Sequence, residues 1–131
     1  MTINQSNKFP KNERLCGEIR IKQLFEAGST FKVHPLKVVY NRIDGVHETS
    51  VQVLISVPKK KIKKAVHRNQ VKRQIRESYR LNKWALHQKC VDKNVQLDLA
   101  FVYLSGTTHP YSEIEEKVKL SLEKIAQTLE V

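Results

Sequence analysis

The segment VQLDLAFVYL, residues 95–104, restricts the possible folds more than any other part of this chain. Its second half is apolar at successive positions, so a strand formed there would present apolar side chains on both faces. Such a strand is covered on both sides or lies in the centre of a sheet. The chain therefore needs a sheet with other elements packed around this strand.

Two further segments have the alternating pattern that is typical of strands, LKVVYNRI (residues 36–43) and SVQVLISV (residues 50–57). The side chains expected on one face of the first are those of Leu36, Val38 and Tyr40. The loop between the two segments contains Asp44 and Gly45, and two alternating runs joined by a Gly-containing loop predict a hairpin. Residues 30–33 can add a short edge strand.

Three segments have the apolar spacing of helices. The first covers about residues 12–27 and stops at Gly28, and the second covers residues 64–82. The third begins near Ser112, which forms a capping box with Glu115. Its apolar side chains recur at helical intervals and are those of Ile114, Val118, Leu122, Ile125 and Leu129.

These elements predict an α+β fold, a single layer of sheet with helices, in the order helix, strands, helix, strand, helix. The 131 residues suit one domain, residues 1–131, of which residues 1–11 are polar and expected to be flexible. The two cysteines, Cys16 and Cys90, indicate a reducing compartment. The longest apolar run, residues 99–104, is far too short to span a membrane, and the first residues lack the apolar stretch of a signal peptide. We expect a cytoplasmic protein without a membrane partner.

The net charge of +11 is concentrated in the first part of the chain. Residues 1–94 contain 21 basic and 7 acidic side chains, whereas residues 95–131 contain 3 basic and 6 acidic ones. Residues 59–80, KKKIKKAVHRNQVKRQIRESYR, contain ten Lys or Arg and a single acid, Glu77. A fold with one strongly basic part is expected to bind a polyanion, of which nucleic acid is the commonest. A membrane surface is the weaker interpretation, because it would favour Trp, Phe and Leu on the other face of a basic helix.

On a helix with about 100° per residue, five polar side chains of residues 64–82, four of them basic, fall on one side. An arc of roughly 100° contains Asn69, Lys72, Arg73, Arg76 and Arg80. Val71 and Ile75 fall on the opposite side, where a sheet can bury them. A Lys-rich helix surface can also be merely solvated. However, like charges at i,i+4 repel one another, and the planar guanidinium suits bidentate contact with phosphate, so we favour a nucleic-acid surface.

Residues 65–80, AVHRNQVKRQIRESYR, resemble the motif helix of the bacterial ribonuclease P protein component. The positions that match its pattern are Arg68, Asn69, Lys72, Arg73, Arg76, Glu77 and Arg80. The segments FEAG (residues 25–28), KVVY and VPKK (residues 57–60) are similar to other parts of the family's pattern. Two positions differ: Gln70 stands where the family usually has Arg, and Ile21 stands where an aromatic residue is common.

The resemblance implies the element order αβββαβα, with a four-stranded sheet and a left-handed crossover through the basic helix, although such connections are usually right-handed. It also implies the protein subunit of ribonuclease P, which together with a catalytic RNA removes the 5′ leader from precursor tRNA. The expected partners are therefore ribonuclease P RNA and precursor tRNA, with no obligate protein partner. The RNA would carry the catalysis with bound magnesium ions, and the protein would contribute no catalytic residue.

The resemblance assigns two groups of site residues. The RNA-binding group comprises Arg68, Asn69, Lys72, Arg73, Arg76, Arg80, Lys59 and Lys60. The leader would lie in a cleft between the first helix and the sheet, because single-stranded RNA stacks on aromatic side chains in a basic groove. The residues expected to line this cleft are Ile21, Phe25, Val38 and Tyr40. Helical spacing alone favours Phe25 as a core residue, and only the resemblance makes it a stacking residue.

The acidic residues are scattered and do not form the paired carboxylates of a two-metal nuclease site. Glu77 is expected to neutralise neighbouring Arg side chains, and Asp98 is either functional or an acid beside basic groups. His87 and Cys90 lie at helical spacing, but two ligands do not make a zinc site, so we expect no metal bound by the protein alone. A generic RNA-binding or ribosomal protein would explain the charge equally well, without preference for precursor over mature tRNA. A stand-alone nuclease would require activity in the absence of RNA.

Overall fold

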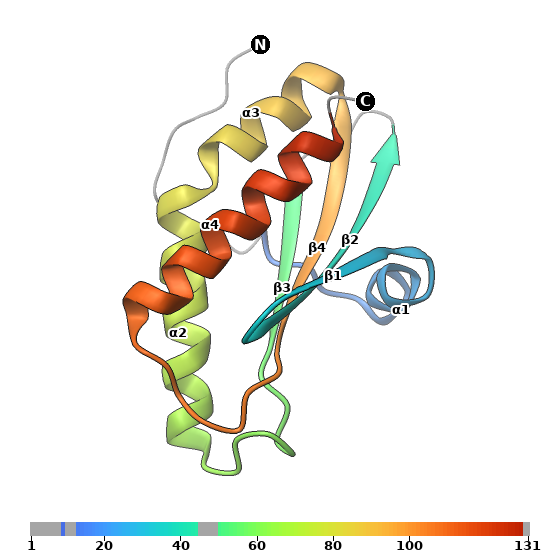
Figure 1. The fold of residues 1–131 in the computed structure, drawn as a ribbon. Coiled ribbons are helices and arrows are strands. Elements are labelled where there is room, and N and C mark those ends of the chain that lie inside the picture. The colour runs from blue at the N-terminus through green and yellow to red at the C-terminus, as the bar shows by residue number, and fades with distance from the viewer. Residues whose placement is uncertain (1–8, 10–12, 45–49, 130–131) are drawn as a thin grey trace.

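The computed structural model describes residue 9, residues 13–44 and residues 50–129 (Figure 1). The elements are α1 (Glu18–Ala27), β1 (Ser29–Val33), β2 (Leu36–Asp44), β3 (Val51–Ser56), α2 (Ala65–Asn82), α3 (Trp84–Lys93), β4 (Val95–Tyr103) and α4 (Tyr111–Thr128). The predicted α+β class is confirmed, since the described part of the chain forms one four-stranded sheet with helices. Apart from Phe9, the segment expected to be flexible lies outside the described residues, and so does Gly45 of the expected turn.

The strand order in the sheet is β1-β2-β4-β3, so β4 lies between β2 and β3. It pairs antiparallel with β2 and parallel with β3. Every residue of β4 except Val102 is buried, which confirms the central strand expected from its apolar sequence. The predicted hairpin between residues 36–43 and 50–57 is wrong, because β4 separates the two strands and buries both of its apolar faces there. β2 instead pairs with β1, the predicted edge strand.

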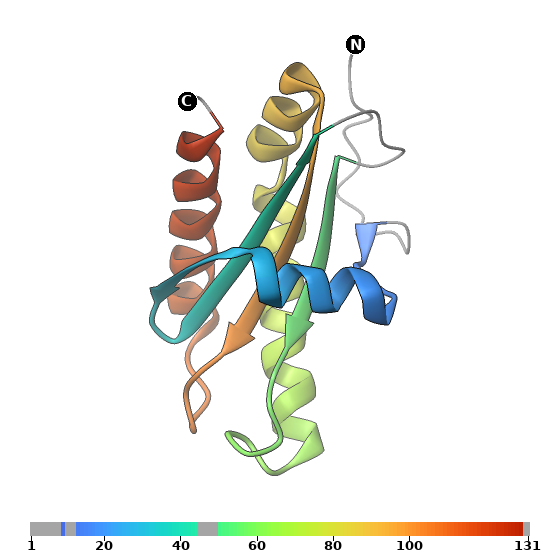
Figure 2. The same cartoon turned by 90° about the vertical axis from the view of Figure 1, so that its right-hand side faces the viewer.

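Side chains of the sheet alternate between two faces, and different helices cover them (Figures 1 and 2). We call the face covered by α2, α3 and α4 the helical face, and the face crossed by α1 the α1 face. Val38 is buried on the helical face, in one cluster with Ile75 and Ile114. Its neighbour Val39 is buried on the α1 face, in a separate cluster with Leu24.

The chain between the parallel strands β3 and β4 passes through α2 and α3 on the helical face. Figure 2 views the sheet from the α1 face: both strands point down, β4 lies to the left of β3, and the two helices lie behind them. This arrangement makes the crossover left-handed, as the resemblance implies, against the usual preference for right-handed connections.

The first helix is shorter than the sequence predicts, because it begins at Glu18 and not near residue 12. Before it, the backbone N–H of Leu15 donates to the carbonyl oxygen of Val53 (2.8 Å), and Arg14 forms a parallel bridge with the same residue. The segment before α1 therefore runs beside the edge strand β3. Its strand-like hydrogen bonds take the place of the first helical turns.

The later helices differ from the prediction in two details. A separate helix, α3, follows α2 directly after Lys83 and was not predicted. The capping box of Ser112 with Glu115 is wrong, because α4 begins at Tyr111 after Pro110 and no side chain caps it. The predicted apolar stripe of α4 is confirmed, and the buried side chains are those of Ile114, Val118, Leu122, Ile125 and Leu129.

Candidate nucleic-acid interface

α2 separates its apolar and its basic side chains onto opposite sides. The buried side chains are those of Val71, Ile75, Ser78 and Tyr79. The exposed polar side chains on the other side are those of Asn69, Arg73 and Arg76, with Lys72 half-buried. The basic side that the helical spacing predicts is therefore turned to solvent, and its binding of RNA stays a prediction.

Two of the predicted RNA-binding Arg side chains also bond within the protein. Arg68 Nη1 donates to the carbonyl oxygens of Ile62 (3.0 Å) and Lys63 (2.6 Å) in the loop before α2. Arg80 Nε donates to a carboxylate oxygen of Glu77 (3.1 Å), and this hydrogen bond lowers the pKa of Glu77 and raises the pKa of Arg80. The prediction that Glu77 neutralises a neighbouring Arg is confirmed.

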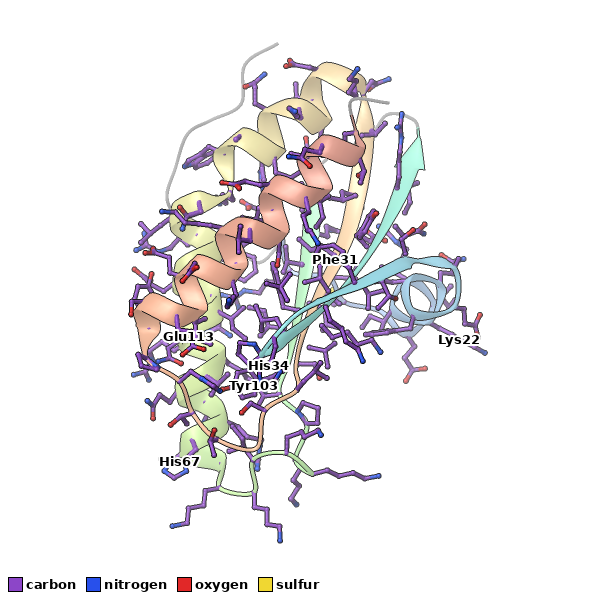
Figure 3. The ribbon with its side chains drawn as sticks, viewed as in Figure 1. Lys22, Phe31, His34, His67, Tyr103 and Glu113 are labelled. Atoms are coloured by element: carbon purple, nitrogen blue, oxygen red, sulfur yellow. The ribbon has the colours of Figure 1, made fainter. Side chains whose placement is uncertain are left out.

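The loop before α2 adds positive charge at one tip of the molecule. Lys59 and Lys60 are exposed in it, whereas Ile62 is buried and anchors the loop to the core of the helical face. His67, in the first turn of α2, lies at the same tip (Figure 3). The hydrogen bonds of Arg68 hold the loop that carries these lysines against the first turn of α2.

A buried polar cluster holds the opposite end of α2. The Lys83 ammonium is fully buried, 2.8 Å from Glu13 Oε1 and 4.7 Å from the ring centre of Trp84. Tyr79 Oη lies 2.7 Å from His87 Nε2. Burial, and secondly the Lys83 charge, lowers the pKa of His87 to about 4, so the neutral ring can accept a hydrogen bond from Tyr79. Since Glu13 precedes α1, this cluster ties the start of the described chain to the junction of α2 and α3.

A second ion pair attaches α1 to the sheet. Arg20 donates from Nε and Nη2 to the two carboxylate oxygens of Asp98, at 3.0 and 2.6 Å. Asp98 is 1% exposed and also accepts a hydrogen bond from Gln96 Nε2 (3.0 Å). Of the two roles left open for Asp98, the structure shows the acid beside a basic group. Nothing in the spacing of residues 12–27 distinguishes Arg20, although an acid in an apolar strand signals a buried partner of opposite charge.

The end of α1 lies close against β2. A Cβ atom at Gly28 would lie 2.9 Å from the carbonyl oxygen of Tyr40 and 3.0 Å from Cγ1 of Val39. Real Cβ atoms do not approach backbone this closely, so a larger residue would push α1 away from the sheet. The Gly of the FEAG segment thus allows Leu24 to be fully buried against the α1 face.

The structure does not bring the four predicted cleft residues together. Ile21 packs on the α1 face, and Phe25 lies one turn later on the same helix. Val38 is fully buried on the helical face, and Tyr40 packs half-buried on that face too. The prediction of one cleft lined by all four is wrong, because side chains alternate along β2 and Val39 is the residue that faces α1.

Phe25 is 44% exposed, which excludes the core position that helical spacing alone favours, and its stacking on RNA stays a prediction. Leu24 takes the buried position of this turn. Leu54 on β3 is half-buried beside the α1 cluster and is a candidate site residue that the sequence analysis does not identify. The alternation of residues 50–57 shows which side chains share a face, but it contains no signal for the face that meets α1.

Within the described residues, no group of three or more His, Cys, Asp or Glu side chains is placed to hold a metal ion. None of the helices in the described part of the chain combines the length and the apolar character needed to cross a membrane. Cys90 is buried, and burial raises the pKa of its thiol to about 12, which disfavours the reactive thiolate.

The mixed sheet, the left-handed crossover and the exposed basic side of α2 define a basic α+β protein whose charged surface suits an extended polyanion. The family model described as Ribonuclease P matches residues 9–126. The chain therefore belongs to the ribonuclease P protein family.

Two relatives show the extent of the similarity. A protein from Porphyromonas gingivalis, "Ribonuclease P protein component", is 38% identical over 127 residues, which cover 96% of this chain and 92% of the relative. A protein of the same description from Chlorobium phaeobacteroides is 36% identical over 108 residues, which cover 76% of this chain and 74% of the relative.

Two solved structures share the fold. The RNase P protein from Staphylococcus aureus has a TM-score of 0.67 at 20% identity and covers 88% of this chain and 95% of its own. The RNase P protein from Thermotoga maritima has a TM-score of 0.66 at 21% identity and covers 86% of this chain and 96% of its own. At these identities the likeness shows the fold alone.

Proposed function

We propose that this chain is the protein subunit of ribonuclease P and acts with a catalytic RNA to remove the 5′ leader from precursor tRNA. The observation that carries the proposal is the exposed side of α2, where Asn69, Arg73 and Arg76 occupy positions of the family's motif. One guanidinium group can donate two parallel hydrogen bonds to the oxygens of a phosphate, and clustered Arg is typical of nucleic-acid surfaces. Membership of the family connects this surface with ribonuclease P RNA.

In this proposal the protein binds and orients RNA, and the chemistry belongs to the RNA subunit with its magnesium ions. The exposed side of α2 and the loop lysines Lys59 and Lys60 contact the RNA subunit. Arg68 supports this surface by holding the loop carbonyls, so its removal would disturb the loop as well as the charge. Magnesium is bound mainly by the RNA.

The α1 face is the surface we propose for the leader of precursor tRNA. Phe25 is 44% exposed there, Ile21 is half-buried one turn before it, and Leu54 offers apolar sheet surface beside the helix. An exposed aromatic side chain on a basic protein can stack on a base of a single strand. Mature tRNA has no leader, so this contact raises affinity for the precursor alone.

Reconstitution with a bacterial ribonuclease P RNA tests the proposal. The protein should lower the magnesium concentration that the RNA needs to cleave precursor tRNA, and protein free of RNA should not cleave it. The double variant Arg73→Ala, Arg76→Ala should weaken binding to the RNA subunit. The negative slope of log K against log salt should become shallower by about 1.5, because two phosphate contacts are lost.

The matched control is the double variant Lys93→Ala, Lys119→Ala, which removes two exposed charges elsewhere. It should bind RNA nearly as the unchanged protein does. Cleavage by RNA-free protein would contradict the proposal. Binding to RNA without any effect on magnesium-dependent cleavage would favour the alternative of a generic RNA-binding protein.

A further inference from the structure

A short segment before α1, residues 13–17, connects the end of α2 with the start of α1, and we call it the lead-in segment. Its first residue, Glu13, is paired with Lys83, which directly follows α2. The carbonyl oxygen of its last residue, Gly17, accepts a backbone hydrogen bond from Ile21 of α1 (3.1 Å). Figure 2 shows α1 crossing the sheet after this segment, which lies beside β3. The lead-in segment therefore joins the helix of the proposed leader surface to the helix of the basic surface.

The contact at the start of the lead-in segment is a buried ion pair. The side chain of Lys83 is 0% exposed, and its ammonium lies 2.8 Å from Oε1 of Glu13, whose side chain is 15% exposed. Taking two charges out of water costs free energy, and an apolar pair of similar volume often gives an equally stable protein. What the ion pair adds is a defined geometry, because its hydrogen bond is strong only over a narrow range of distance and direction. Lys83 itself cannot touch RNA, since the protein covers it fully.

One hydrogen bond and one buried side chain tie the rest of the lead-in segment to the sheet and to α1. The backbone N–H of Leu15 donates to the carbonyl oxygen of Val53 (2.8 Å). The Leu15 side chain is buried in one cluster with Leu24 of α1. A shift of the segment by one residue along β3 would turn Leu15 out of this cluster and take Glu13 away from Lys83. The ion pair and the buried leucine therefore fix the same register.

The other contacts of α1 leave the start of this helix to the lead-in segment. Within α1, all of which the structure describes, Leu24 is the single buried residue. Arg20, one turn earlier on the same side, adds the ion pair with Asp98. The close approach of Gly28 to β2 holds the far end of the helix. A helix held at its middle and its far end can still tilt at its start, and the lead-in segment restricts this movement.

We propose that Glu13 and Lys83 are positioning residues for leader recognition, which hold α1 at a fixed place relative to α2 through the lead-in segment. The inference rests on the proposed function, because it requires that α1 meets the leader while α2 meets the RNA subunit. When the RNA subunit holds α2, the ion pair determines where Phe25 and Ile21 stand against the leader. Loss of the ion pair should therefore lower the preference for precursor over mature tRNA and leave the affinity for the RNA subunit unchanged.

The first experiment compares Lys83→Met with Lys119→Met. Both changes remove one positive charge, but Lys83→Met keeps bulk at the buried site and breaks the ion pair, whereas Lys119 is exposed on α4. Binding assays give the affinity of the reconstituted enzyme for precursor and for mature tRNA, and the affinity of the protein for the RNA subunit. For Lys83→Met the ratio of precursor to mature affinity should fall about threefold or more, with the RNA-subunit affinity within about twofold of the unchanged protein. An unchanged ratio, or an equally large loss of RNA-subunit affinity, would overturn the inference.

A second variant approaches the ion pair from its other partner. Glu13→Gln removes the negative charge but keeps a neutral acceptor for the ammonium, so the ratio of precursor to mature affinity should fall less, by about twofold. Glu123→Gln, at an exposed position of α4, is its control and should leave the ratio unchanged. Circular dichroism shows whether each variant is folded at the temperature used. If Lys83→Met does not fold, Glu13→Gln decides, and an unchanged ratio for it then overturns the inference.

A double-mutant cycle with Phe25→Ala shows whether the ion pair acts through α1. In the unchanged protein Phe25→Ala should lower the affinity for precursor tRNA about fivefold. In the Lys83→Met background the same change should lower it by about twofold or less, because Phe25 is no longer held against the leader. Losses that simply multiply would show that Lys83 acts by another route and would overturn the inference.

The same measurements separate this inference from the proposed function. If the reconstituted enzyme with the unchanged protein has no preference for precursor over mature tRNA, the proposed role in leader binding fails, and this inference fails with it. If the preference is present and Lys83→Met retains it in full, the inference alone fails and the proposed function stands.

Discussion

The two faces of the sheet are held by different kinds of contact. On the helical face, 21 of the described residues form one buried cluster. On the α1 face, the buried cluster contains four residues, Leu15, Leu24, Val39 and Ala100. Polar contacts, above all the pair of Arg20 with Asp98, hold α1 in addition.

This difference separates the stability of the fold from the display of side chains to a partner. Removing apolar surface from water supplies most of the favourable free energy of folding, so the helical face carries most of the stability. α1 exposes Ile19 (75%) and Phe25 (44%) and still keeps its place through a few buried residues and one ion pair. We therefore expect α1 to open locally before the helical face does.

The largest effect should come from removing core volume on the helical face. Ile75 is fully buried there, and Ile75→Ala should lower the free energy of unfolding by about 3 to 5 kcal/mol. The matched change Leu24→Ala should cost about 2 to 3 kcal/mol, because α1 can shift to fill part of the cavity. Urea denaturation measures both losses, and hydrogen exchange should become faster in α1 alone for Leu24→Ala. If both variants lose the same free energy of unfolding and Leu24→Ala speeds hydrogen exchange throughout the sheet, the two faces do not differ in stability.

Acid should lower the free energy of unfolding, because His87 is buried in its neutral form. Burial and the Lys83 charge lower the pKa of His87 from 6.5 to about 4, so between these pH values the unfolded chain binds the additional proton. The stabilisation is therefore complete above about pH 6.5 and is lost as the pH falls towards 4. The loss should be on the order of 3 kcal/mol, measured by urea denaturation across this range. His87→Gln lacks the titrating group, so its free energy of unfolding should depend less on pH in this range. If the variant and the unchanged protein show the same pH dependence, His87 is not the group responsible.

Removing one or the other partner of the Arg20–Asp98 ion pair should lower the free energy of unfolding by different amounts. Arg20→Gln leaves the carboxylate of Asp98 charged and nearly fully buried, whereas Asp98→Asn leaves an Arg side chain that is 36% exposed and can be hydrated. We expect a loss of about 2 to 3 kcal/mol for Arg20→Gln and about 1 kcal/mol for Asp98→Asn. Thermal or urea denaturation measures both. The reverse order would show that Arg20 is held by contacts other than Asp98.

The smallest of these effects on stability should come from Phe25, because much of its side chain is exposed. Phe25→Ala should change the free energy of unfolding by less than about 1 kcal/mol, because the side chain is 44% exposed. Affinity of the reconstituted enzyme for leader-bearing tRNA should fall about fivefold or more, while mature tRNA binds as before. Ile19→Ala on the same helix is the control. If Phe25→Ala loses the same affinity for precursor and for mature tRNA, the leader does not bind on the α1 face.

Local patterns were sufficient where one segment alone decides which of its side chains are buried. The apolar run of β4 predicts a central strand, and the helical spacing predicts α2 to within one residue of its observed bounds. The stripe on α2 correctly separates Val71 and Ile75 from Arg73 and Arg76, because the turn of the helix fixes their relative directions.

Local patterns failed where the answer depends on a distant partner. The hairpin of β2 with β3 is a sound local prediction, but β4 competes for the same edges and buries more apolar surface between them. Tyr40 and Val39 are equally suited to face α1 by their sequence, and only the packing of α1 on β2 assigns that role to Val39. Arg68 matches the motif, yet its guanidinium lies within reach of the loop carbonyls.

The sequence by itself determined the α+β class, the central strand, the basic side of α2 and the family, because periodicity and motif are properties of neighbouring residues. The tertiary structure alone decided the strand order, the face that α1 covers, the exposure of Phe25 and the partners of Asp98 and Lys83. Those features depend on which segments, far apart in the chain, bury apolar surface and satisfy buried charge together. Alternation along a strand defines two faces, but only packing in three dimensions decides what each face meets.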